Sequence, residues 1–271
     1  MNAPFFYPIL YLHKIFYTTK LNPNNLPELT KSMFLGQQKW SATNWDDTLK
    51  KHSRDAEKLL NKIKIFDLWK EILETKYGGV SNELIPEIIM DAYISVHFAC
   101  MGLYKQANVC LRAQLETALR LVHFSTHPVE FKWWRDGIVD LGGQEWWGKG
   151  YDYFCRLEEV KAFEKASNHT LFNAVKKVYK ILSKYVHSEV PSFQTTQFRL
   201  SPKYKIDSYK KWSYNFKEVQ DCINTLFSLG FSVEFKARNT NDQKKVLRII
   251  RFEKIKRCLR KSLALKFRGR I

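Results

Sequence analysis

Four side chains of this sequence combine a proton carrier with two cations and a carboxylate: His187, Arg112, Lys180 and Glu116. An imidazole can move the proton of a ribose 2′-hydroxyl, and a cation can stabilise the charge that grows on the attacked phosphate. Glu116 can orient Arg112, because residues four apart are neighbours on a helix. Residues of these types could carry out acid–base chemistry at a phosphate, with His187 as acid and base and with Arg112 and Lys180 as phosphate contacts.

The same residues allow a non-catalytic interpretation, and both are kept open. A lysine binds phosphate as a point charge and lacks the two-pronged contact of a guanidinium, which makes Lys180 a weak partner for His187. Lys180 and His187 would then belong to a solvated helix face. Arg112 and Glu116 would form an ordinary ion pair.

No metal or cofactor site is predicted. His123 and His127 have the spacing of two ligands on one helix, but a third ligand is not visible near them. The sequence has no glycine pattern for nucleotide phosphates and no acidic cluster for Mg²⁺. Chemistry that depends on such groups is therefore disfavoured.

Two helical patterns must position Arg112 and Glu116. Apolar residues recur every three or four positions over residues 92–103 and 107–122, which is the period of a helix. Because the connection 102–106 is short, the two helices should form an antiparallel hairpin. A third pattern, over residues 171–187, ends at His187. An all-α fold is predicted, a helical bundle built on this hairpin.

These motifs resemble the HEPN superfamily of small helical proteins, in particular its bacterial members. The resemblance covers roughly residues 84–190 and rests on Gly102, Ala107, Arg112 and Glu116, followed by the segment 182–187. It implies a helical bundle, and in many members an arginine and a histidine that cleave RNA without metal at a site shared by two protomers. His187 matches that histidine, whereas Lys180 stands where the arginine would be. The resemblance also implies an effector of a bacterial toxin or phage-defence system.

The remaining chain divides around this bundle. Residues 1–43 are predicted to be an apolar N-terminal arm and a connection, and residues 44–235 the bundle. Within the bundle we expect a helix over 44–76 that stops at Gly78–Gly79, a loop over 192–212 and a helix start at Asn215. Residues 128–150 hold two tryptophan pairs and several glycines, which predicts an irregular packed cap, with a base-stacking platform as the alternative.

The net charge of +18 favours a polyanionic partner, nucleic acid first and an anionic membrane surface second. Residues 236–271 hold 14 Lys or Arg against two acidic residues, yet keep a helical apolar pattern, so a basic amphipathic helix is predicted there. Such a helix would neutralise phosphates with little sequence preference. Its predicted nucleic-acid contacts are Lys244, Lys245, Arg248, Arg251, Lys254, Arg257, Arg260 and Lys261.

The predicted location is the cytoplasm. The five cysteines are odd in number and far apart, which is typical of reduced thiols. The apolar N-terminal run meets His13 and Lys14 before the ~20 residues that a membrane span needs, so no span is expected. We expect RNA as partner more than DNA, together with a second copy of the chain or a partner protein from a neighbouring gene. The alternative to a ribonuclease is a non-catalytic nucleic-acid-binding or scaffold subunit.

Overall fold

The computed structural model describes residues 28–138, 152–168, 170–187, 189, 203–251 and 253–263. Over these residues all regular structure is helical, so the predicted all-α fold is confirmed. Most of the predicted N-terminal arm lies outside the described residues. The helices are α2 (Glu28–Ile63), α3 (Ile65–Cys100), α4 (Tyr104–Phe124), α5 (Pro128–Arg135), α7 (Glu158–Ser167), α8 (Thr170–His187), α9 (Ile206–Gly230), α10 (Ser232–Ala237), α11 (Thr240–Ile249) and α12 (Glu253–Ser262).

Helices α3 and α4 run antiparallel and are joined by a very tight turn. Ser95 on α3 donates to the Ala107 carbonyl on α4 at 2.7 Å, and two turns farther along Gln114 donates to the Ile88 carbonyl at 3.1 Å. Gly102 in the turn has a φ of +77°, and a Cβ there would lie 3.2 Å from the Asn44 amide nitrogen. A glycine is therefore required at the turn.

Helix α3 consists of two helical segments that meet at Tyr77, directly before Gly78–Gly79. Tyr77 has non-helical angles, with a φ of −122° and a ψ of 19°, and the chain reverses its direction there. Before the kink Trp69 donates to Asn224 of α9, and after it Ser95 lies back at Trp212, near the start of α9. The predicted helix end at the two glycines is therefore confirmed. The boundary between α2 and α3 at Lys64 keeps helical angles.

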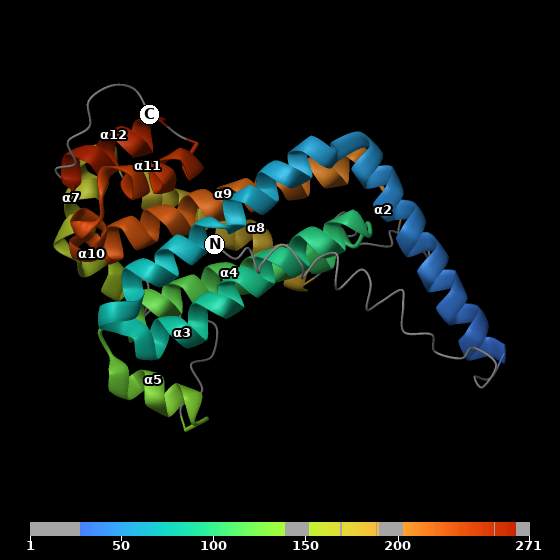
Figure 1. Ribbon diagram of the computed structural model, residues 1–271, viewed down its shortest axis with the longest axis horizontal. Helices are drawn as coiled ribbons and strands as arrows, with labels where there is room; N and C mark the ends of the chain where they lie inside the picture. The colour runs from blue at the N-terminus through green and yellow to red at the C-terminus, as the bar shows by residue number, and fades with distance from the viewer. Residues whose placement is uncertain are drawn as a thin grey trace, which may run out of the picture.

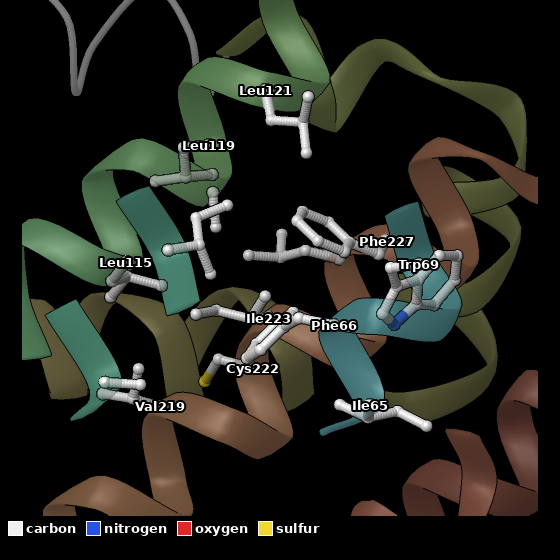
Figure 2. Close-up of a cluster of buried hydrophobic side chains, with 14 of the residues drawn as sticks. Ile65, Phe66, Trp69, Leu115, Leu119, Leu121, Val219, Cys222, Ile223 and Phe227 are labelled. Carbon is white, nitrogen blue, oxygen red and sulfur yellow. The ribbon is translucent and has the colours of Figure 1, made fainter. Parts of the chain in front are cut away.

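Helix α9 lies in the centre of the molecule and runs parallel to α4. Buried amides join the two helices, from Asn215 to Asn108 at 2.8 Å and from Gln220 to Gln114 at 3.0 Å. Because α9 begins at Ile206, the predicted helix start at Asn215 is wrong, and that residue is a buried mid-helix contact. Part of the predicted loop 192–212 is thus helical, and its residues 192–202 lie outside the described ones. Figure 2 shows the core that α3, α4 and α9 share.

The basic C-terminal region forms three short helices in place of the single long one predicted. The backbone is extended at Arg238, Asn239 and Ile250, which separates α10, α11 and α12. The apolar side of this region packs against the bundle, with Leu247 and Leu259 fully buried. Figure 1 shows α11 and α12 gathered against one end of α9. Residues 264–271 lie outside the described part of the chain.

Two further segments differ from the sequence-based expectation. Helix α2 begins at Glu28 and kinks at His52, and its first part projects away from the other helices (Figure 1). The predicted boundary at residues 43/44 therefore falls inside a helix. The start of the tryptophan-rich insertion is the regular helix α5, with Trp134 packed 5.4 Å from the Phe124 ring. Residues 139–150 of the predicted cap lie outside the described residues.

Candidate nucleic-acid interface

The outer face of α8 carries lysines and no acidic residue. Over its 18 residues the helix has no aspartate or glutamate, while Val175 and Leu182 fill the core from the opposite side. Lysines four residues apart on one helix are about 6 Å apart along its axis. The outward set consists of Lys176, Lys177, Lys180 and Lys184, with His187 at the helix end.

The charges of this face, which we call the α8 lysine face, are nearly uncompensated. Lys176, Lys177 and Lys180 are exposed, and none of them forms an ion pair with an acidic residue in the described part of the chain. Lys184 is half-buried and lies 3.7 Å from the Glu189 carboxylate. Solvated protein surfaces normally mix both signs of charge, so this face is unusual for a surface with no anionic partner.

The predicted Arg112–Glu116 pair is present and is completed by a tyrosine of α8. Arg112 Nε donates to Glu116 Oε1 at 2.9 Å, and Arg112 Nη2 donates to the Tyr179 hydroxyl at 2.8 Å. The Tyr179 hydroxyl donates in turn to the same Glu116 oxygen at 3.1 Å. Only 15% of the Arg112 side chain and 22% of the Glu116 side chain are exposed. This closed triangle holds α4 against α8.

Sequence reasoning missed the role of Tyr179 because its spacing placed it in the apolar stripe of α8. The available signal was its hydroxyl, since a tyrosine at the edge of a core usually finds a polar partner. Burial raises the pKa of Tyr179, and the neighbouring Glu116 carboxylate raises it further. The hydroxyl therefore stays protonated and remains a donor at neutral pH.

The structure does not gather the four predicted catalytic residues at one point. His187 is exposed at the end of α8, eight residues and about 12 Å along the helix axis from Tyr179, where Arg112 is held. Lys180 is exposed about 10 Å along the axis from His187. Among the described residues no hydrogen bond or ion pair joins the His187 imidazole to Arg112 or Glu116. Arg112 and Glu116 thus form one group with Tyr179, and the exposed Lys180 and His187 lie outside that group.

Arg251, one of the predicted phosphate contacts, forms ion pairs within the protein. Its Nε lies 2.7 Å from Asp221 Oδ2, and its guanidinium also pairs with Glu218. Its backbone N–H donates to the other Asp221 oxygen at 3.2 Å. Burial raises the pKa of Asp221 to about 6. The contact anchors the start of α12 to α9.

The other predicted C-terminal contacts differ in their exposure. Lys245 is exposed but lies 2.9 Å from Asp242, and Lys244 and Arg260 are half-buried. The sequence pattern could not separate these residues, because it shows helix faces and not the partners that other helices bring. The exposed members of the predicted set without an ion pair in the described residues are Arg248, Lys254, Arg257 and Lys261.

The two histidines with metal-ligand spacing stack on each other. The rings of His123 and His127 are 4.2 Å apart and nearly parallel, and His123 Nε2 lies 2.8 Å from the Glu130 carboxylate. Parallel rings do not direct their nitrogens toward one point. Over the described ranges, no group of three or more His, Cys, Asp or Glu residues is placed to hold a metal ion.

The five cysteines are free, and Cys100, Cys222 and Cys258 are buried. None of the helices in the described residues combines the length and apolar character that crossing a membrane requires.

Comparisons of the chain with protein-family models, with curated proteins and with solved structures give no match.

Proposed function

We propose that this chain binds nucleic acid, RNA in preference to DNA, and that the α8 lysine face is its main phosphate-binding surface. The observation that supports the proposal is the row of lysines on an 18-residue helix without an acidic residue. The net charge of +18 adds a long-range attraction for polyanions. Phosphate contacts of this kind position a nucleic acid without reading its sequence.

Binding is tested by fluorescence anisotropy with a labelled single-stranded RNA and a DNA of the same sequence. Three lysines that neutralise phosphates on a single strand give a slope of log affinity against log salt of about −2. Replacing Lys176, Lys180 and Lys184 by glutamine should lower affinity and reduce the steepness of this dependence by about that amount. A slope that stays the same in the variant would contradict the proposal.

A matched control removes the same charge from other surfaces. Lys39 on α2, Lys132 on α5 and Lys236 on α10 are all exposed. Replacing these three by glutamine also lowers the net charge by three, so it reports the effect of long-range attraction alone. The α8 variant should lose clearly more affinity than this control.

Metal-independent RNA cleavage, as the HEPN resemblance implies, is the second candidate. It is supported by the exposed imidazole of His187, which lies on the same helix face as Ser183 and Lys180. Arg112 supports the non-catalytic alternative, because its guanidinium is engaged by Glu116 and Tyr179.

Cleavage is tested by incubating RNA in EDTA with the wild type and with His187→Ala. A DNA of the same sequence is the control, since it lacks the 2′-hydroxyl nucleophile. Catalysis predicts that only the wild type cleaves and only RNA is cleaved. Equal cleavage by both proteins, or none by either, removes the catalytic candidate and leaves a binding or scaffold subunit.

A further inference from the structure

Tyr214 is an unusually exposed aromatic side chain on the central helix α9. Its relative exposure is 48%, although α9 is otherwise largely buried. The Arg251 guanidinium lies 5.5 Å from the ring centroid. This contact holds the ring in place while nearly half of it remains open to solvent.

On one side, Tyr214 is connected to the α8 lysine face. Lys211 is exposed one turn earlier on α9, and residues three apart share a helix face. Its Nζ lies 5.9 Å from the ring of Tyr185 on α8. Tyr185 directly follows Lys184, which lies on the α9 side of the lysine face. Positive charge thus continues from α8 onto α9.

On the other side, Tyr214 is connected to the C-terminal helices. Arg251, beside the ring, leads into α12, where Lys254 and Arg257 are exposed. Figure 1 shows α8 on one side of α9 and α11 with α12 on the other, and α9 contacts all three. The nearby carboxylates of Glu218 and Asp221 both pair with Arg251, and Lys62 is a second cation that acts on Asp221, so two positive charges face the two negative ones. The cations therefore dominate along this path.

From this arrangement we infer that a single-stranded nucleic acid crosses α9 between the α8 lysine face and the start of α12, and that Tyr214 stacks against one of its bases. The inference rests on the proposed function and extends it by naming the class of ligand. Proteins that bind single strands combine a cationic path with aromatic rings, because every base offers a flat face while the backbone offers phosphates. In a duplex the bases are already paired and stacked on one another, so no base is available to stack on Tyr214.

The test compares Tyr214→Leu with the wild type on three probes: single-stranded RNA, the corresponding RNA duplex and inorganic polyphosphate. Stacking on one aromatic ring accounts for roughly 5- to 100-fold in affinity. Tyr214→Leu should therefore lose about that factor on the single strand. Its affinity for polyphosphate, which has no bases, should be unchanged, and so should its affinity for the duplex. Tyr214→Phe should bind the single strand like the wild type.

Trp133→Leu is the matched control, because Trp133 on α5 has a similar exposure of 45% and lies in the tryptophan-rich segment. It should bind the single strand normally. Unchanged single-strand binding by Tyr214→Leu, or an equal loss on polyphosphate, overturns the inference, and so does a loss seen only with Trp133→Leu. These results leave the proposed function intact, whereas a wild type that binds none of the probes refutes the proposed function itself. Circular dichroism melting checks that the variants are folded.

Discussion

Replacement of Arg251 by methionine should destabilise the protein strongly, although the sequence places this residue among the phosphate contacts. The variant leaves Asp221 and Glu218 without their main partner, and their side chains are only 3% and 12% exposed. Removing one partner of a fully buried ion pair costs 3–5 kcal/mol. Because 30% of the Arg251 side chain is exposed, we expect the lower end, about 3 kcal/mol.

The loss can be measured by urea unfolding followed by circular dichroism at 222 nm. With a slope of about 3 kcal/mol per molar urea, a loss of about 3 kcal/mol moves the unfolding midpoint down by about 1 M. Arg248→Met is the matched control, because Arg248 is exposed on the neighbouring helix α11. A surface change of this kind should cost less than about 0.5 kcal/mol. Equal midpoints for the two variants would refute the structural role assigned to Arg251.

Two further predictions concern the backbone and pH. Gly102→Ala should destabilise the protein by about 1–3 kcal/mol, because its φ of +77° and its close contacts disfavour a side chain. Gly79→Ala, in an open helical position, should instead stabilise it by about 0.5–1 kcal/mol in the same urea assay; the reverse order would contradict the turn geometry. Burial, aided by the charge of Glu87, raises the pKa of half-buried Asp91 to about 7. The stability that depends on the protonated side chain is fully present below the pKa of the unfolded state, near 3.8, and is lost as the pH rises through 7. Asp91→Asn should therefore match the wild type near pH 4 and exceed it by about 2 kcal/mol at pH 8, after allowance for solvent screening, and an unchanged pH dependence would argue against this.

Local spacing was sufficient to predict contacts within a single helix. The Arg112–Glu116 pair follows from residues four apart, and the lysines of α8 follow from the same periodicity. The helix limits were predicted in part. The two glycines correctly indicated a helix end, because the chain kinks at Tyr77, directly before them. The start of α9 was missed, because burial extends this helix back to Ile206 although the sequence there has no clear helical pattern.

Contacts between distant segments could not be predicted from spacing. Tyr179 joins Arg112 across 67 residues, and Arg251 joins Asp221 across 30. Neither partner can be recognised from its own segment, because Tyr179 resembles a core tyrosine and Asp221 resembles a surface acid. The pairing depends on which helices pack together, and a single sequence does not state that.

The distinction between structural and available cations explains why the proposed interface lies on α8. A cation that pairs with a buried carboxylate cannot move to a phosphate without leaving that carboxylate buried and unpaired. The unpaired charge costs several kcal/mol. Arg251 is such a cation, whereas Lys176 and Lys180 on α8 have no acidic partner among the described residues. A polyanion can therefore contact α8 without breaking any interaction that stabilises the fold. The C-terminal helices can add affinity through Arg257 and its exposed neighbours, but Arg251 itself acts by fixing their position beside Tyr214.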